Sequence, residues 1–392
     1  MNVTEYLQKW SVSYRDDMLG NIMPFWLKHG LDLRNGGVYT CLDRDGSLID
    51  TTKSVWFQGR FAFTCSYAYN HIEQNPEWLA AAKSTIDFIE QHCFDSDGRM
   101  FFEVTASGEP LRKRRYVFSE TFAAIAMAEY AIASGEREYA EKALKLFKDI
   151  QRFLNTPGVL EPKYWNTVQS KGHSIVMILI NTASRIRAAI ADPALDKQID
   201  DSIALLQKDF MHPEFNALLE TVGSNGEFID TINGRIINPG HCIETSWFIL
   251  EEAKYRNWDK QLTDMALTIL DWSWEWGWDK EYGGIINFRD CRNLPPQDYA
   301  HDMKFCWPQT EAIIASLYAY QATKDEKYLA MHRQVSDWTY AHFPDHEFGE
   351  WYGYLHRDGT VSQPAKGNIF KGPFHIPRMM TKGYELCREL LP

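Results

Sequence analysis

The feature that most constrains this chain is a helical segment without a polar face that recurs six times. Three examples read SVWFQGRFAFTCSYAY, HSIVMILINTAS and CWPQTEAIIASLYAY, in which the residues are apolar or small almost all round. A helix of this kind must be enclosed by other elements. The six segments begin near residues 54, 118, 171, 241, 304 and 373, so successive starts lie roughly 50 to 70 residues apart. We therefore predict six repeats, each with one buried inner helix.

A second kind of helix alternates with the first. In residues 195–210, for example, Leu195, Ile199 and Ile203 form an apolar stripe, and charged residues fill the opposite face. Such helices have one side in water, so we predict that they form an outer layer. The predicted helices of both kinds lie near 2–29, 54–73, 77–93, 118–134, 136–154, 171–191, 195–210, 241–256, 258–276, 304–323, 325–342 and 373–390.

The connections between these helices are of two lengths. Each inner helix passes to the next outer helix through a short turn, whereas each outer helix returns to the next inner one through a long loop. Short turns require antiparallel neighbours, so all the long loops lie on one face with the starts of the inner helices. Glycines that flank alternating aromatic or β-branched residues predict hairpins at 35–46, 97–108, 282–293 and 348–359. The predicted fold is an all-α (α/α)6 barrel with short β-hairpin loops on one rim, formed by residues 1–392 as a single domain.

Composition excludes several classes of ligand. The 392 residues carry 41 basic and 53 acidic side chains, a net charge of -12, so we expect no capture of nucleic acid or of an anionic membrane. No apolar run has membrane-spanning length, and MNVTEYLQKW has no signal-peptide pattern. Seven scattered cysteines lack CxxC spacing, which argues against a zinc site or a disulfide framework. We predict a cytoplasmic protein, and the sequence contains no motif for a phosphate or a metal.

Each inner helix carries an ionisable residue near its start, where a charge is costly to bury unless it is paired. Because the starts of the inner helices lie on the same face as the long loops, we expect these residues at one rim. The helix N-termini meet there as well, and their dipoles favour a developing negative charge. The ionisable residues are Arg60, Glu120, His173, His241, Glu244, Glu311, His375 and Arg378.

His241 and His375 are the strongest candidates for acid–base catalysis among these residues. An imidazole with a pKa near 6.5 both accepts and donates a proton near neutral pH. Each of the two follows a segment rich in Gly and Pro and has an ionisable residue at i+3. They lie two repeats apart, so the two rings could approach one substrate from different sides, with Arg60 on the wall opposite His241.

The other candidates have competing structural explanations. Glu120 and His173 are more readily explained as hydrogen-bonded core residues, and Glu120 could pair with Arg60 across the barrel. Core packing and substrate contact are equally good explanations for three aromatic residues, Trp307, Trp56 and Tyr39. The histidines expected at the surface, in or beside loops, are His212, His342, His346 and His356.

Four segments together resemble the N-acylglucosamine 2-epimerase family, also known as the renin-binding proteins. They are TKSVWFQGR (52–60), INPGHCIETSWF (237–248), EFGEWYGYLHRDG (347–359) and FKGPFHIPR (370–378). The superfamily also contains cellobiose 2-epimerases and aldose–ketose isomerases of mannose or sulfosugars. The phrases WFQGR and FKGPFHIPR favour the N-acyl branch, whereas CWPQTEA is about as similar to the cellobiose and mannose enzymes.

The resemblance implies an (α/α)6-barrel enzyme that interconverts N-acetyl-D-glucosamine and N-acetyl-D-mannosamine and needs no cofactor for the chemistry. It also implies ATP or another nucleotide as an allosteric activator, a homodimer and a role in sialic acid catabolism. A Trp pair that is frequent in the family is replaced here by Cys306 and Trp307. The positions that match the family's essential residues are Arg60, His241, Glu244, Glu311, His375 and Arg378.

Inversion at C2 of an open-chain aldose suggests a mechanism for these residues. We hypothesise that His375 removes the C2 proton of one epimer, that His241 delivers a proton to the opposite face, and that Arg60 stabilises the enolate oxygen. Glu244 and Glu311 would orient the imidazoles or assist ring opening. The residues expected to contact the sugar are Arg378, Trp307, Tyr39, Trp56, Glu120 and His173.

Four alternatives remain open at this point. A 2-epimerase of cellobiose or mannose would use the same residues, and an aldose–ketose isomerase would move the proton from C2 to C1. A glycoside hydrolase would need two carboxylates, for which Glu120 and Glu311 are the candidates. A non-enzymatic protease-binding role predicts a large exposed apolar patch.

Overall fold

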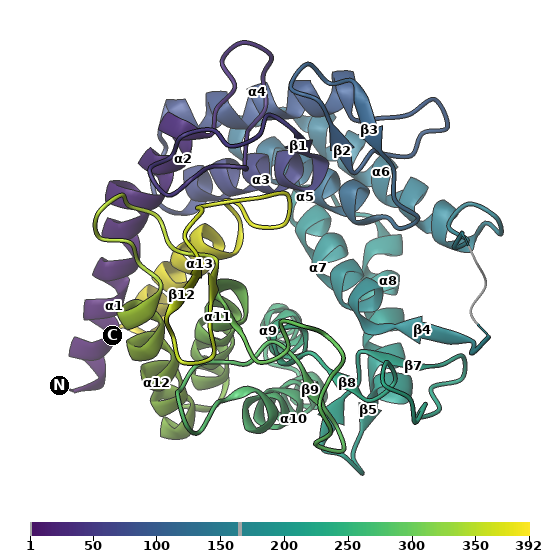
Figure 1. The fold of residues 1–392 in the computed structure, drawn as a ribbon, viewed down its shortest axis with the longest axis vertical. Coiled ribbons are helices and arrows are strands. Elements are labelled where there is room, and N and C mark those ends of the chain that lie inside the picture. The colour runs from purple at the N-terminus through teal and green to yellow at the C-terminus, as the bar shows by residue number, and fades with distance from the viewer. Residues whose placement is uncertain (1, 164–166) are drawn as a thin grey trace.

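The computed structural model describes residues 2–163 and 167–392, and its helices are arranged in a ring (Figure 1). The inner helices contact one another in chain order, and the last contacts the first, which closes the ring. They are buried along most of their length. These helices are α3 (Val55–His71), α5 (Phe118–Ser134), α7 (His173–Ala189), α9 (Pro239–Tyr255), α11 (Cys306–Thr323) and α13 (His375–Leu390).

The outer helices each pack on an inner one. The N-terminal helix α1 packs on α13, α2 contacts η1, and each outer helix from α4 onward packs on the inner helix that precedes it. The predicted (α/α)6 barrel is confirmed. Two predicted outer helices, 2–29 and 195–210, contain a π-helical turn, η1 (Met18–Ile22) or η2 (Leu206–Phe210). The remaining outer segments are α1 (Val3–Asp17), α2 (Met23–His29), α4 (Pro76–His92), α6 (Arg137–Asn155), α8 (Pro193–Leu205), α10 (Lys260–Gly277) and α12 (Glu326–His342).

The long loops carry short antiparallel strands that tie each loop to its neighbour. One sheet has the order β1 (Lys53–Ser54), β2 (Glu103–Val104), β3 (Pro110–Arg112), and another has the order β10 (Lys304–Phe305), β11 (Tyr354–Leu355), β12 (Val361–Gln363). The strand pairs are β4 (Ser170–Gly172) with β7 (Thr221–Gly223), β5 (Met211–His212) with β6 (Ala217–Leu218), and β8 (Ile236–Ile237) with β9 (Arg289–Asp290).

The hairpins differ in position from those predicted. Their paired strands lie within 103–112 and 354–363, a few residues beyond the predicted 97–108 and 348–359. Strand β9, within the predicted hairpin 282–293, pairs with β8 of the preceding loop instead of with its own segment. Three of the four predicted hairpins contain strand residues, whereas 35–46 has only the isolated bridges of Val38 and Leu42. Partners on another loop cannot be read from a local pattern.

The first backbone N–H of several inner helices donates to the next long loop. Val55 donates to the carbonyl of Phe102, His173 to that of Glu220, and Cys306 to that of Gly353. By contrast, five outer helices begin with an Asn or Asp side chain that accepts a backbone N–H: Asn2, Asn75, Asp192, Asp259 and Asp325. The inner helices are therefore anchored by the loops that cover them.

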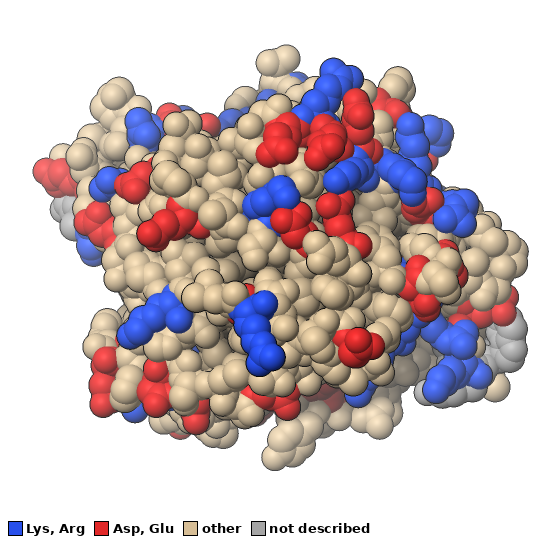
Figure 2. Space-filling model, turned by 90° about the horizontal axis from the view of Figure 1, so that it is seen from above, with Lys and Arg blue, Asp and Glu red and all other residues tan. Residues whose placement is uncertain are grey.

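Buried ion pairs hold the same loops. The Nζ atom of Lys53 lies 2.7 Å from Asp32, and that of Lys304 lies 2.9 Å from Asp279, with both lysines fully buried. On the face that Figure 2 shows, acidic and basic side chains are interspersed. Among the described residues, no helix has the length and hydropathy needed to cross a bilayer.

Candidate active site

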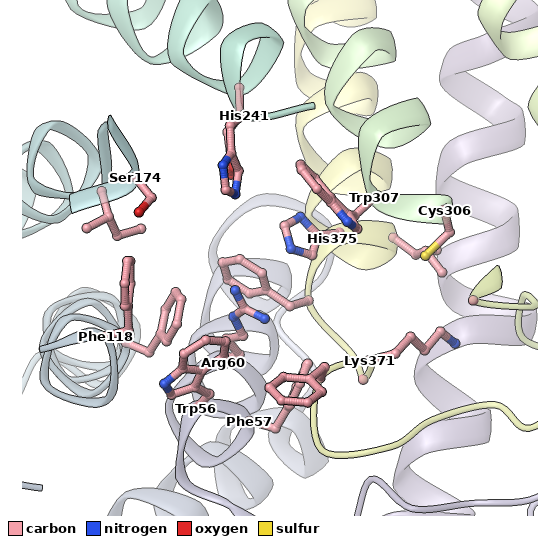
Figure 3. A pocket seen from close by; sticks show the side chains of 18 of the residues that line it. Trp56, Phe57, Arg60, Phe118, Ser174, His241, Cys306, Trp307, Lys371 and His375 are labelled. Carbon is pink, nitrogen blue, oxygen red and sulfur yellow. The ribbon is translucent and has the colours of Figure 1, made fainter. Parts of the chain in front are cut away.

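The starts of the six inner helices line one cavity of about 360 Å³, a size typical of small-molecule sites. Figure 3 shows His241, His375 and Arg60 pointing toward a common space. The six helices contribute, among others, Arg60 of α3, Phe118 of α5, Ser174 of α7, His241 of α9, Trp307 of α11 and His375 of α13. The loop argument from the sequence thus placed the cavity at the correct end of the barrel.

The two imidazoles flank one indole. The ring centroid of Trp307 lies 5.2 Å from that of His241 and 5.7 Å from that of His375. Gly240 permits this contact, because a Cβ atom there would lie 2.4 Å from Cη2 of Trp307. The glycine that precedes His241 is therefore required for the shape of the site.

His241 is held by a carboxylate. Its Nδ1 lies 3.1 Å from Oε2 of Glu220 and 3.1 Å from Nδ2 of Asn238. Burial opposes the charged imidazole, but the charge and hydrogen bond of Glu220, together with the charge of Glu244, outweigh burial and raise the pKa of His241. Burial likewise opposes the charged form of Glu220, but His241 and His173 together lower the pKa of Glu220 to about 2.

His375 has a carboxylate partner as well, in a different electrostatic setting. Its Nδ1 lies 2.8 Å from Oε1 of Glu311, whose other oxygen lies 2.8 Å from Arg378 and accepts a hydrogen bond from Trp247. Burial, followed by the charges of Arg378 and Arg60, holds the pKa of His375 well below its usual value. The surroundings therefore bias His375 toward the neutral form, which accepts a proton, and His241 toward the protonated form, which donates one.

Arg60 is a cation without a carboxylate partner within 4.0 Å among the described residues. Its guanidinium carbon lies 4.1 Å from the ring of Phe122 and 4.7 Å from that of Phe374, and two further rings complete the surroundings. Burial lowers the pKa of Arg60 to about 9, so the group is still charged at neutral pH. An unpaired cation in a cavity is suited to stabilise an oxyanion that forms during a reaction.

Glu244, Arg378 and Glu311 form a buried network behind His375. The guanidinium of Arg378 binds both carboxylates, and only Glu244 of the three lines the cavity. Arg378 is 4% exposed, so its predicted contact with the sugar is not supported. Its position instead allows it to orient Glu311 and, through Glu311, the ring of His375.

Three other residues predicted to contact the substrate do not line the cavity. The hydroxyl of Tyr39 donates to Asp32 in the first long loop. Glu120 pairs with Arg99 at 2.7 Å, not with Arg60. His173 is fully buried and lies 2.8 Å from the hydroxyl of Thr245. The polar groups of these three residues therefore have partners inside the protein. By contrast, Trp56 and Trp307 both line the cavity.

Two clusters have the residue types that ligate metals. The ligand-type atoms of His173, Glu220 and His241, and those of Glu244, Glu311 and His375, lie within 4.8 Å of one another in each cluster. The second cluster contains the guanidinium of Arg378, which would repel a cation. The hydrogen bonds within both clusters suit acid–base chemistry, and the absence of a metal from the reaction stays a prediction.

Sequence reasoning missed Glu220 and Asn238. Glu220 lies in a loop between β6 and β7, where no helical spacing relates it to His241. Asn238 caps α9 through the backbone N–H of His241, and an Asn before Pro at a helix start is a recognisable capping signal. His212, expected at the surface, is 8% exposed, because the rings of Phe215 and Phe228 pack near it.

Comparison with known proteins decides the family. The family profile described as N-acylglucosamine 2-epimerase (GlcNAc 2-epimerase) matches residues 37–371. The N-acylglucosamine 2-epimerase of Bos taurus is 33% identical over 95% of this chain and 90% of its own length. The chain belongs to the N-acylglucosamine 2-epimerase family. The Homo sapiens enzyme of the same name is 31% identical over 99% of this chain and 91% of its own.

The fold agrees with this family membership. The solved structure of the cellobiose 2-epimerase from Bacillus thermoamylovorans matches with a TM-score of 0.86 and 22% identity, covering 96% of this chain and 99% of that one. This likeness establishes the (α/α)6 barrel. As a member of the N-acylglucosamine 2-epimerase family over nearly its full length, the chain is an epimerase, an isomerase of carbohydrates.

Proposed function

We propose that this epimerase interconverts N-acetyl-D-glucosamine and N-acetyl-D-mannosamine by removing and replacing the proton at C2. The observation that carries the proposal is the placement of two imidazoles beside the same indole, with His375 biased toward the neutral form and His241 toward the protonated form, on a cavity that also holds the guanidinium of Arg60. A two-base inversion requires these three groups. Relatives at 33% and 31% identity that bear the name N-acylglucosamine 2-epimerase support this substrate pair.

The proposed reaction begins with the open-chain aldehyde, because only then is the C2 hydrogen acidic. His375, whose Nδ1–H donates to Glu311, uses its free Nε2 to take the C2 proton. The electron pair moves onto O1, and Arg60 stabilises the resulting enolate. His241 then delivers its Nε2 proton to C2 from the other side, which inverts the centre. The reverse reaction uses the same two residues with their roles exchanged.

Ring opening needs a separate proton transfer between O5 and O1. Glu244 is the carboxylate of the buried network that reaches the cavity, so we assign it this step or the orientation of the open chain. Glu311 and Arg378 act behind the cavity by fixing His375. Trp307 and Trp56 supply apolar surfaces against which a sugar can pack.

The experiment that tests this function is proton NMR of the enzyme with N-acetyl-D-mannosamine in D2O. We expect N-acetyl-D-glucosamine that carries deuterium at C2, and at least about a hundredfold loss of rate in His375→Ala and in His241→Ala. Conversion without deuterium at C2, or no conversion of either amino sugar, would refute the proposal.

The same assay separates the alternatives. Conversion of cellobiose or mannose in place of the amino sugars would indicate the branch named by the cellobiose 2-epimerase neighbour, and a ketose product would indicate an aldose–ketose isomerase. A glycoside hydrolase is disfavoured because Glu120 and Glu311 are both fully buried and engaged, one with Arg99 and one with His375 and Arg378.

Further predictions belong to this proposal. We expect a homodimer, activation by ATP or another nucleotide at an allosteric site, a cytoplasmic location and a role in sialic acid catabolism, with residues 1–392 as one catalytic domain. The seven cysteines are all free and buried, in keeping with a reducing compartment. Light scattering measures the oligomeric state, and the epimerase assay with and without ATP tests the activator.

A further inference from the structure

We propose that Glu220, which the sequence motifs do not include, is a positioning residue: it holds His241 with Nδ1 turned away from the substrate and Nε2 toward it, ready to deliver a proton to C2. This inference rests on the proposed epimerase function. Glu220 does not line the cavity, so it acts through His241 and does not touch the sugar.

The backbone fixes Glu220 in place. Its N–H donates to the carbonyl of Ile236 at 2.9 Å, and its carbonyl accepts the N–H of His173 at 3.0 Å. Ile236 belongs to β8, the strand that leads into α9, and His173 is the first residue of α7. Glu220 is thus anchored between the starts of the two inner helices that present His173 and His241.

The carboxylate of Glu220 is directed at His241. Its two oxygens lie 3.2 and 3.1 Å from Nδ1 of His241. Since Nδ1 is occupied, Nε2 is the nitrogen left to face the cavity. The side chains of His241 and Glu220 are 27% and 20% exposed, and of the two only His241 lines the cavity.

His241 is the nearer of the two imidazoles to this carboxylate. The hydroxyl of Thr245 donates to the carbonyl of His241, so it accepts from Nε2 of His173. The other ring nitrogen of His173, Nδ1, lies 3.6 Å from Glu220 and has no hydrogen-bond partner, whereas Nδ1 of His241 lies 3.1 Å from the same carboxylate.

The charged and titratable groups that face His241 are Glu220 from the β6–β7 loop, Glu244 from its own helix, Arg60 from α3, His173 from α7 and His375 from α13. Of these, only the two glutamates favour a protonated His241. Glu244 is bound to Arg378, which offsets its charge. Removal of the charge of Glu220 should leave burial as the dominant influence and lower the pKa of His241.

The substitution that tests this role is Glu220→Gln, which keeps the shape and removes the charge. The matched control is Glu214→Gln, since Glu214 lies 2.9 Å from Nδ1 of His212 in the same loop and outside the cavity. Glu220→Asp keeps the charge and shortens the side chain. All three proteins are compared with the wild type by thermal unfolding to verify that they fold.

We expect Glu220→Gln to lower kcat by about 10²-fold with little change in KM. The alkaline limb of its pH profile should move to lower pH, because His241 must be protonated to deliver a proton. In D2O, an enolate that His241 cannot protonate returns through His375. The ratio of deuterium in the recovered starting sugar to deuterium in the epimerised product should therefore be higher for Glu220→Gln than for the wild type. Glu220→Asp should restore the alkaline limb, and Glu214→Gln should behave as the wild type.

A measurement without substrate separates this inference from the proposed function. The titration of His241, followed by 15N NMR of histidine-labelled protein, should shift to lower pH in Glu220→Gln and stay in place in Glu214→Gln. An unchanged His241 titration, or an unchanged alkaline limb and deuterium ratio in a folded Glu220→Gln protein, would overturn the inference while leaving the epimerase proposal intact. If the wild type epimerises no amino sugar although the titration shifts, the proposed function fails, and with it the proton delivery assigned here.

Discussion

Replacement of Arg60 by Met should stabilise the protein while it abolishes activity. Arg60 is half-buried among four aromatic rings, with no carboxylate within 4.0 Å among the residues that the structure describes. Burial lowers its pKa from 12.5 to about 9, which at 1.36 kcal/mol per pKa unit corresponds to about 5 kcal/mol against the charged form in the folded state. Contacts between the cation and the rings recover part of this cost. We therefore expect Arg60→Met to raise the free energy of unfolding by about 1–3 kcal/mol.

The matched control is the same substitution at a paired cation. Arg378 binds Glu244 and Glu311, so Arg378→Met leaves two buried carboxylates uncompensated and should destabilise the fold by about 3–5 kcal/mol. Urea unfolding followed by circular dichroism gives both free energies, and the epimerase assay should show a loss of about 10²–10³-fold in kcat for Arg60→Met. A destabilised Arg60→Met protein, or one that keeps its activity, would refute this account of Arg60.

Three further predictions follow from other contacts. The pH profile of kcat/KM should be flat through pH 6.5 and fall on both sides. The reaction needs a neutral His375, whose pKa is lowered, and a protonated His241, whose pKa is raised. A narrow maximum near pH 6.5 would contradict this expectation. Gly240→Ala should raise KM about tenfold by displacing Trp307, whereas Gly20→Ala, where a Cβ meets nothing within 4 Å, should leave KM unchanged. Glu120→Gln should lower the free energy of unfolding by about 3 kcal/mol through loss of the Arg99 ion pair, with KM unaffected.

Much of the fold was predictable because the barrel is built from local periodicity. The apolar helices and the unequal connections were sufficient to predict the inner ring, the outer ring and the face that carries the loops. Arg60, His241 and His375 could be found because each lies at the start of a helix that otherwise has no polar face.

The remaining residues were not predictable because their partners lie in loops. Glu120 lies in the first turn of α5, near the start of an inner helix as Arg60 does, yet Arg99 from the loop before α5 forms an ion pair with it. The hydroxyl of Tyr39 donates to Asp32. Glu220 comes from a loop, and the conformation of a loop cannot be predicted from a repeating sequence pattern. The side chains that a helix presents can be derived from the sequence, but the loop residues that meet them depend on long-range packing.

The difference between the two Glu–His pairs bears on how a reversible enzyme completes its cycle. After one turnover His375 holds a proton and His241 has lost one, so the site must exchange both protons before it can repeat the same direction. The side chains of His375 and His241 are 17% and 27% exposed, so solvent in the cavity can reach both. The ratio of kcat/KM in the two directions is fixed by the equilibrium between the sugars. The pKa difference therefore cannot favour one direction over a cycle.

Proton exchange after product release should therefore limit kcat in the direction that starts with neutral His375. In the reverse direction, the form with protonated His375 and neutral His241 must arise before the chemical step. We expect kcat in the first direction to rise with the concentration of a small proton-carrying buffer at constant pH and ionic strength, while kcat/KM stays constant. Independence of both constants from buffer concentration would show that the protons return by a faster route, such as direct transfer between the two imidazoles through cavity water.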